Sequence, residues 1–405
     1  MRKIDIKLSS LIFLFIFGAY IAYLRGSNFS DGDSYSVINA FLSLLNQEIY
    51  SPSRGAYGHP IPELLIGFMA YNFGTRFSNI FCFVLFFLSI IFLYKTFLRN
   101  KDNLSLFTIL VLSNSYLFLE NTNSIDYPIA LFFLSIGFYF LKSQKYFLAY
   151  IFFGITIASR ANFLTFIYPS LFIFFFNELK NKNFKNLTIS LLVVTIVGLI
   201  FYYPLFDLHN YSLNFLDLPF LKENDDRVGW YGGPSLQFSS LFPRFIYKIY
   251  LIVGIFSIFY LLTLFIDLIK KIQFTEVDNI ILLFIVFINI FIFYFMPTKI
   301  LIINPFIIFS YIIIFKYLDS KKIYFLIIFN FLQWFIFYDI AEIKYKEKDI
   351  CFAKEAIEYN FQISIRKGML VNYFTDNENM IECYSQFMGN YSESFKESKP
   401  LKSSN

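Results

Sequence analysis

The stretch from residue 30 to residue 74 reads S-D-G-D-S-Y-S at 30–36, E-I-Y-S-P-S-R-G-A-Y-G-H-P-I-P-E-L-L at 48–65 and N-F-G at 72–74. It lies between two hydrophobic segments, 8–24 and 77–98, and is therefore expected to emerge on one face of a membrane. The stretch begins with two carboxylates and ends with an arginine, a histidine and two prolines ahead of a short apolar helix. Acidic side chains beside cations at a membrane face indicate chemistry on a lipid-linked phosphate.

The composition places the whole chain in a membrane. Its 405 residues are 57% hydrophobic and only 16% charged, whereas a soluble domain carries about 25% charged residues. The mean hydropathy is +0.57. The first apolar segment has no small-residue cleavage site and reads as an anchor. We therefore predict an all-α polytopic membrane protein.

The apolar runs predict about eleven transmembrane helices. The stretch 60–74 is apolar but too short to span, because a perpendicular helix needs about 20 residues, and it is expected to be an interfacial helix. The runs 146–158 and 161–176 are also short, and a single broken hairpin is the alternative there. The expected spans are 8–24, 77–98, 104–119, 126–141, 146–158, 161–176, 187–206, 244–266, 279–297, 300–316 and 323–340.

Lysine and arginine placement sets the orientation. With the N-terminus inside, sixteen of these residues fall in the inner loops and nine in the outer connections before residue 341. The bias would invert if 60–74 spanned. The expected outer parts are the loops 25–76 and 207–243 and a small extracytoplasmic region, 341–405, after a transmembrane module, 1–340. Cys351 and Cys383 lie in that region and either pair in an oxidising exterior or remain thiols.

Asp31 and Asp33 are the candidate catalytic residues. They follow the first span, and Gly32 between them allows a sharp turn that faces both side chains to one site. Either one carboxylate removes a proton from an acceptor hydroxyl, or both hold a divalent cation through hard oxygen ligands. The alternative is an ordinary solvated loop.

Arg54 and His59 close the same outer loop and are candidates for binding the donor phosphate or substrate. Pro60 and Pro62 set an extended backbone ahead of the interfacial helix. The chain has only two histidines, His59 and His209, and both fall on the expected outer face. The alternative for each is a surface hydrogen-bonding residue.

Asp126 and Arg160 stand at the outer ends of later spans. A carboxylate at a membrane boundary has to be solvated or paired, so Asp126 is a candidate binding residue, a helix cap, or both. Arg160 is a candidate phosphate ligand because its planar fork binds two oxygens at once. A snorkelling interface residue is the alternative for Arg160.

Arg227 is the remaining candidate binding residue, in D-D-R-V-G-W-Y-G-G-P at 225–234. Trp230 and Tyr231 beside it either stack on a sugar or rest at the headgroup level, as membrane-interface aromatics do. The sequence contains no glycine-rich nucleotide loop, no CxxC pair and no soluble-type catalytic triad. We expect no nucleic-acid partner.

In their order, these features resemble the C-type glycosyltransferases, polytopic enzymes that use lipid-phosphate-linked sugars and include aminoarabinose transferases and protein O-mannosyltransferases. The resemblance covers roughly residues 8–176. Two departures are the split of the proline pair by Ile61 and the short C-terminal region, which concerns acceptor recognition. The matching stretches are D-G-D-S-Y (31–35), I-Y-S-P (49–52), G-H-P-I-P-E-L-L (58–65), N-F-G-T-R-F-S-N (72–79), I-D-Y-P-I-A-L-F-F (125–133) and G-I-T-I-A-S-R-A-N-F-L (154–164).

The resemblance implies that the first outer loop carries the catalytic aspartate, at Asp31 with Asp33 beside it, and that Asp126 holds the family's Asp-x-Pro position. The reverse assignment of Asp31 and Asp33 is the alternative. The expected reaction is transfer of a sugar, with inversion, from a polyprenyl-phosphate donor to a glycan, lipid or protein acceptor. The expected location is a bacterial inner membrane, with the site facing outward and a divalent cation as a possible cofactor. An O-antigen-type polymerase and a lipid-linked-sugar flippase are the rival functions.

Overall fold

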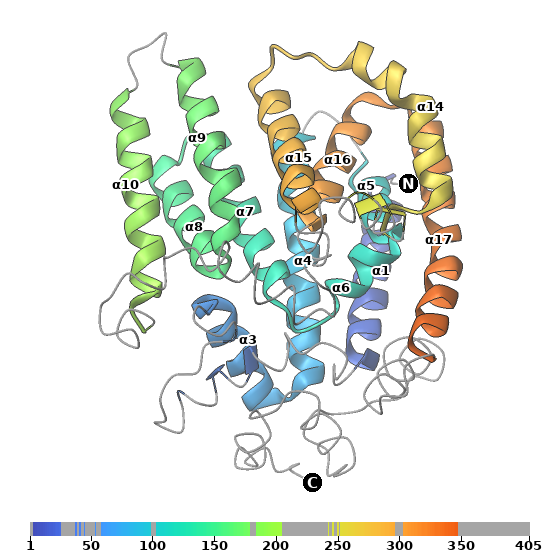
Figure 1. Ribbon diagram of the computed structural model, residues 1–405, viewed down its shortest axis with the longest axis horizontal. Helices are drawn as coiled ribbons and strands as arrows, with labels where there is room; N and C mark the ends of the chain where they lie inside the picture. The colour runs from blue at the N-terminus through green and yellow to red at the C-terminus, as the bar shows by residue number, and fades with distance from the viewer. Residues whose placement is uncertain are drawn as a thin grey trace.

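The structure is a computed structural model. It describes residues 3–25, 58–98, 103–178, 184–204, 252–295 and 303–346, with further positions at 37–38, 40–41, 44, 53, 242, 245–246 and 249–250. These ranges are almost entirely helical and contain no strand. Figure 1 shows the helices gathered side by side into one bundle. The all-α prediction is confirmed for the described part of the chain.

Most described helices follow the expected apolar runs, but the expected span 244–266 is not one helix, because Gly254 has φ +88° and α14 begins after it. They are α1 (Lys3–Arg25), α3 (Pro60–Phe73), α4 (Thr75–Phe97), α5 (Leu104–Ser113), α6 (Ser115–Glu120), α7 (Asp126–Lys142), α8 (Tyr146–Ser159), the 3-10 turn η1 (Ala161–Phe163), α9 (Leu164–Glu178), α10 (Phe184–Phe201), α14 (Ile255–Lys271), α15 (Val277–Phe295), α16 (Asn304–Tyr317) and α17 (Ser320–Lys346). The runs 146–158 and 161–176 correspond to separate helices, α8 and α9, with η1 between them. Helix α17 continues to Lys346, beyond the expected end at residue 340.

The prediction of a single helix over 104–119 is wrong, because the chain leaves the helical conformation at Asn114 and forms two helices, α5 and α6. This residue is extended (φ −73°, ψ 112°), and its side chain accepts a hydrogen bond from the Leu117 amide at 2.9 Å. Asparagine side chains compete with the helix for backbone groups and favour such caps. Asn114 also donates to the Ile252 carbonyl at 3.0 Å and to the Tyr311 hydroxyl at 3.3 Å. Contacts that are distant in sequence therefore stabilise the break.

The bundle is held by close helix packing and by edge-to-face aromatic rings. Helix α7 packs between α4 and α8, α8 packs on α10, and α15 packs on α9 and α16. The buried ring of Phe138 meets the rings of Phe97 and Phe153 at 5.6 and 5.3 Å between centroids. Such pairs are worth about 0.5–1.5 kcal/mol beyond burial. Gly154 brings α8 close to α10, since a Cβ there would lie 2.6 Å from Val197 Cβ.

Helix α3 lies at one end of the bundle, at the bottom of Figure 1, where it packs on α4, α8 and α7. Pro60 and Pro62 lie in the first turn of the helix, where the backbone N–H groups that proline lacks would have no acceptor within the helix. Gly74 joins α3 to α4 with φ +83°, a backbone conformation that residues other than glycine adopt only with strain. The tight joint sets the end of α3 beside the start of α4, and His59, just before the other end of α3, lies 3.2 Å from Asp126 at the start of α7.

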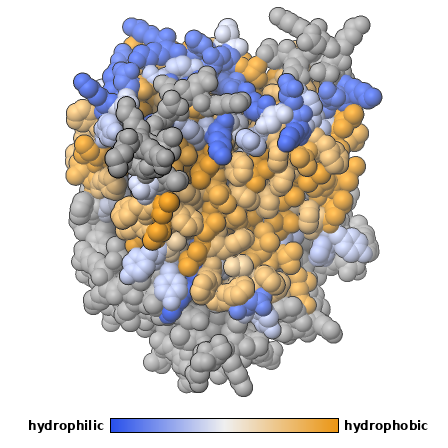
Figure 2. Space-filling model, turned by 180° about the vertical axis from the view of Figure 1, so that it is seen from behind, coloured by the Kyte–Doolittle hydropathy of each residue, from blue (hydrophilic) through white to orange (hydrophobic). Residues whose placement is uncertain are grey.

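The outer surface of the bundle is apolar. Figure 2 shows a broad hydrophobic band with hydrophilic residues along its upper edge. Large side chains such as Phe13 (67% exposed), Phe259 (61%) and Phe287 (67%) face outward from α1, α14 and α15. Among the described residues, two helices, Arg76–Phe97 and Val277–Tyr294, are long and apolar enough to cross a membrane by length and composition. A broad exposed apolar surface of this kind is typical of a protein that contacts an apolar partner or a lipid phase.

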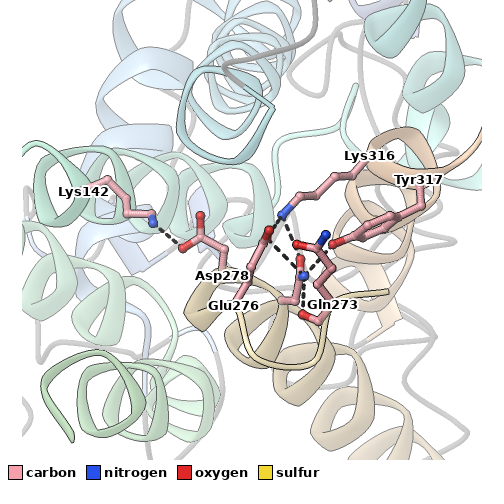
Figure 3. Close-up of polar contacts among 7 residues, drawn as sticks. Lys142, Gln273, Glu276, Asp278, Lys316 and Tyr317 are labelled. Carbon is pink, nitrogen blue, oxygen red and sulfur yellow. Dashed lines mark hydrogen bonds and ion pairs between the residues drawn. The ribbon is translucent and has the colours of Figure 1, made fainter. Parts of the chain in front are cut away.

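Charged side chains tie several helices together at the end of the bundle away from α3. Lys142 at the end of α7 forms an ion pair with Asp278 of α15. Lys316 donates to Glu276 at 2.6 Å and to Asn279 at 2.9 Å, and Asn279 donates to the Tyr317 hydroxyl (Figure 3).

A separate pair joins α14 to α17 through Lys322 and Asp267, 3.0 Å apart. The hydrogen bond from Lys322 lowers the pKa of Asp267 below its ordinary value. The side chains are 30% and 53% exposed, and such partly solvated pairs add little to the free energy of unfolding.

Candidate functional site

Three of the predicted binding residues meet at the α3 end of the bundle. His59 precedes α3, Asp126 is the first residue of α7, and Arg160 follows the last residue of α8. His59 Nε2 lies 3.2 Å from Asp126 Oδ2, and Arg160 NH1 forms an ion pair with the same oxygen. The exposed fractions are 5% for His59, 0% for Asp126 and 7% for Arg160. We call this group the His59–Asp126–Arg160 cluster.

A buried polar turn holds Asp126 in place. The turn over residues 121–125 connects α6 to α7, and its four polar residues are at most 3% exposed. Ser124 donates to Asn79 Oδ1 of α4 at 2.7 Å and lies 2.5 Å from the hydroxyl of Ser78. The thiol of Cys82 contacts the Ile125 carbonyl at 3.8 Å. Since α4 supplies all three partners, the start of α7 is fixed against α4.

Arg160 is oriented by contacts on two sides of its guanidinium. NH1 is engaged by Asp126, and the guanidinium carbon lies 3.7 Å from the centre of the Tyr127 ring. A cation over an aromatic face is attracted by the ring quadrupole, most strongly where water is excluded. Its backbone amide donates to the Thr156 carbonyl at 2.8 Å, which is the last helical bond of α8, and its extended backbone (φ −163°, ψ 108°) ends the helix. A snorkelling arginine extends its charged group into water, whereas Arg160 is 7% exposed and its guanidinium contacts Asp126 and Tyr127.

One edge of Arg160 remains unused. Among the residues that the structure describes, no acceptor bonds the buried Nε of Arg160. Asn123 Oδ1 and Asn162 Oδ1, on the segments next to Asp126 and Arg160, are likewise buried without a described donor. Buried polar atoms are nearly always hydrogen-bonded in folded proteins. A donor edge and two acceptor oxygens are therefore available for a ligand that carries both acceptors and hydroxyl groups.

A second buried carboxylate, that of Glu63, supports the cluster from α3. Glu63 is 1% exposed, and its Oε1 accepts the backbone amides of His59 and Ser53, each at 2.9 Å. Bonds from amides to a carboxylate are charge-assisted and stronger than neutral ones. Through the His59 amide, Glu63 fixes the backbone from which the imidazole reaches Asp126.

The remaining candidates lie outside the described residues. These are Asp31, Asp33, Arg54 and Arg227, together with the suggested partners Trp230 and Tyr231 and the cysteines Cys351 and Cys383. In the part of the chain that is described, no group of three or more His, Cys, Asp or Glu residues could hold a metal ion. The predicted cation ligands, Asp31 and Asp33, lie outside that part.

A different polar cluster lies at the α5–α6 break. Asn330 of α17 donates to Ser113 at 2.9 Å and to Tyr311 at 3.0 Å, and it accepts from Ser257 at 2.9 Å. The indole of Trp334 donates to the Ser113 carbonyl at 2.8 Å. The side-chain amide groups of Asn114 and Asn330 already bond to neutral groups of the described helices. These two side chains therefore join helices and are not candidates for binding a ligand.

Sequence reasoning missed Glu63, Tyr127 and the Ser78–Asn79–Ser124 contacts. One signal was visible for Glu63, since it is the only charge in the apolar segment 60–74, and such residues are seldom incidental in a membrane setting. Tyr127 carried no signal of its own, because tyrosine is abundant along this chain. No protein-family model, curated protein or solved structure matches the chain.

Proposed function

We propose that this protein is a multi-pass membrane glycosyltransferase that moves a sugar from a polyprenyl-phosphate donor to an acceptor on the extracytoplasmic face. The resemblance to C-type glycosyltransferases described above supports the class. The apolar outer surface and the two span-length helices support the membrane setting. A lipid-linked donor suits such a protein, since its tail stays in the bilayer while its headgroup meets the end of the bundle.

The arrangement of charges supports the proposed orientation. Helix α7 has 17 residues and is therefore about 25 Å long, close to the thickness of a bilayer's hydrocarbon core. Its first residue, Asp126, belongs to the His59–Asp126–Arg160 cluster, and its last residue, Lys142, pairs with Asp278. Lysines mark the cytoplasmic side of membrane proteins. The cluster then faces outward, toward the extracytoplasmic side of a bacterial inner membrane, and residues 341–405 lie on the same side.

The observation that carries the proposal is the unused edge of Arg160. Its Nε is a buried cationic donor, and Asn123 Oδ1 and Asn162 Oδ1 on the nearby segments have no donor among the residues that the structure describes. A phosphate-linked sugar supplies phosphate oxygens to the former and hydroxyl donors to the latter. Asp126 and Tyr127 hold the guanidinium in one orientation, and a fixed cation stabilises charge on a departing phosphate well.

The proposed step is a direct displacement. Asp31, with Asp33 as its neighbour, accepts the proton of the acceptor hydroxyl. The acceptor oxygen bonds to the anomeric carbon, the bond from that carbon to the phosphate oxygen breaks, and polyprenyl phosphate leaves with the electron pair. Attack from the opposite face inverts the anomeric centre. Arg54, His59, Asp126, Arg160 and Arg227 bind the donor, and a divalent cation at Asp31 and Asp33 is an optional part of the site.

The experiment is transfer of radiolabel from a polyprenyl-phosphate-sugar to acceptor in vesicles that contain the purified protein. Labelled acceptor, absent with protein-free vesicles, supports the transferase. A ladder of long products indicates the polymerase instead. The flippase is favoured by one observation, the helix break at Asn114 within a polar cluster, because broken helices are typical of transporter sites. Donor that changes leaflet without label transfer would establish the flippase and overturn the transferase.

A further inference from the structure

The strongest unassigned feature is the buried carboxylate of Glu63. It lies in the first part of α3, in a helix that is otherwise apolar and whose outer face is exposed at Leu64 and Phe68. Burying a carboxylate costs several kcal/mol unless it is bonded. Its Oε1 accepts two backbone amides, those of Ser53 and His59.

The geometry links Glu63 to the cluster through the backbone of His59. The His59 amide is held by Glu63, the His59 carbonyl accepts the Glu63 amide at 3.0 Å, and His59 Nε2 lies 3.2 Å from Asp126. His59 is thus held at both backbone groups by one residue of α3. Removal of the Glu63 carboxylate would take away the oxygen that accepts the backbone N–H groups of His59 and Ser53.

We propose that Glu63 is a positioning residue that sets the backbone of His59 so that the imidazole stays on Asp126. Asp126 in turn orients Arg160, so Glu63 acts on the donor-binding group through His59 and touches no substrate itself. The effect on sugar transfer rests on the proposed function, whereas the effect on His59 does not. Glu63 acts here as a hydrogen-bond acceptor through one oxygen. The side-chain carbonyl oxygen of glutamine can accept the same bonds, so Glu63→Gln should preserve them.

The test uses the fact that the chain has only two histidines. In a His209→Asn background, protein labelled at histidine Cε1 gives one NMR signal, that of His59. We expect Glu63→Ala to shift and broaden this signal at fixed pH, and Glu63→Gln to leave it near its original position. Leu64→Ala is the matched control, because it truncates an exposed neighbour in the same helix and should not move the signal.

Transfer assays extend the test. Glu63→Ala should lower kcat/KM about ten- to a hundredfold, which is the range expected for losing bonds to a charged group, whereas Glu63→Gln should retain most of it. Glu63→Ala added to His59→Ala should lower the rate no further than His59→Ala alone, because residues that act in series are not additive. If Glu63→Ala does not fold, Glu63→Asp replaces it, since the shorter side chain withdraws the oxygen from both amides.

An unchanged His59 signal in Glu63→Ala would overturn the proposal. So would a Glu63→Gln protein as damaged as Glu63→Ala, because the charge and not the bond would then matter. If Glu63→Ala shifts the His59 signal as expected but the wild-type protein transfers no sugar, the proposed function is overturned and the positioning role stands.

Discussion

His59 Nε2 lies 3.2 Å from Asp126 Oδ2, which joins the start of α3 to the start of α7. Arg160 pairs with the same oxygen from the end of α8. One carboxylate oxygen therefore connects three helix ends that are far apart in the sequence. The predictions below separate what this junction contributes to the fold from what it contributes to the proposed reaction.

Arg160→Lys should separate donor binding from structure. Lysine keeps a positive charge beside Asp126 but has neither the planar face that stacks on Tyr127 nor the Nε edge. We expect donor affinity to fall about tenfold or more, with a smaller loss of thermal stability than in Arg160→Ala. Donor titration and thermal unfolding in the same detergent measure the two effects. Unchanged donor affinity in Arg160→Lys would show that the Nε edge does not bind the phosphate.

Asp126→Leu and Arg160→Met should each destabilise the protein by roughly 3–5 kcal/mol, because each leaves a buried charge without its partner. The double substitution should be far less damaging than the two single changes combined, since it removes both charges. Reversible unfolding of the four proteins gives the coupling energy. Additive losses would mean that the ion pair does not exist in solution.

Asp31→Asn should lower turnover by about 10²–10⁴-fold, the range of general-base catalysis. Donor binding and expression should change little, because an exposed loop carboxylate adds little to folding. Asp33→Asn should reduce turnover less if Asp33 is only a neighbour. Initial transfer rates against donor concentration measure both. Wild-type turnover in both variants would remove the first loop from the catalytic site.

Lys142→Ala should have little effect on either stability or transfer. Its ion pair with Asp278 is partly solvent-exposed, with side-chain exposures of 32% and 23%, and such pairs contribute about 1 kcal/mol or less. Thermal unfolding and transfer rate check this, with Asp278→Ala as the matched partner. A rate loss comparable to that of Arg160→Lys would mean that the two ends of α7 are coupled.

Cysteine labelling from either side of the membrane should place residues 50 and 225 and the C-terminus outside, and residues 142 and 316 inside. The reason is the excess of lysine and arginine in the proposed inner loops. A membrane-impermeant maleimide on intact cells and on inverted vesicles distinguishes the two sides. A cytoplasmic C-terminus would mean that the proposed number of spans is wrong by one.

The sequence by itself predicted most helices of the described ranges and their order, but not the interruptions at Asn114 and Gly254. In the proposed bilayer, a long apolar run satisfies its backbone polar groups within a helix, and the described runs are helical. The expected ends at Asp126 and Arg160 also hold, because Pro128 favours a helix start there and the backbone of Arg160 leaves the helical conformation. The break at Asn114 did not follow, since an asparagine in an apolar run indicates a break only when distant groups, here Ile252 and Tyr311, accept its side chain.

Only the tertiary structure decided that the predicted binding residues touch. The sequence placed His59, Asp126 and Arg160 on the same expected face as candidate binding residues, but it did not predict that they contact one another. Packing of α7 between α4 and α8, with α3 across their ends, brings the three side chains to one oxygen. The physical reason is that periodicity and hydropathy fix which side of a helix is apolar and where it ends, whereas ion pairs depend on how helices distant in sequence pack together.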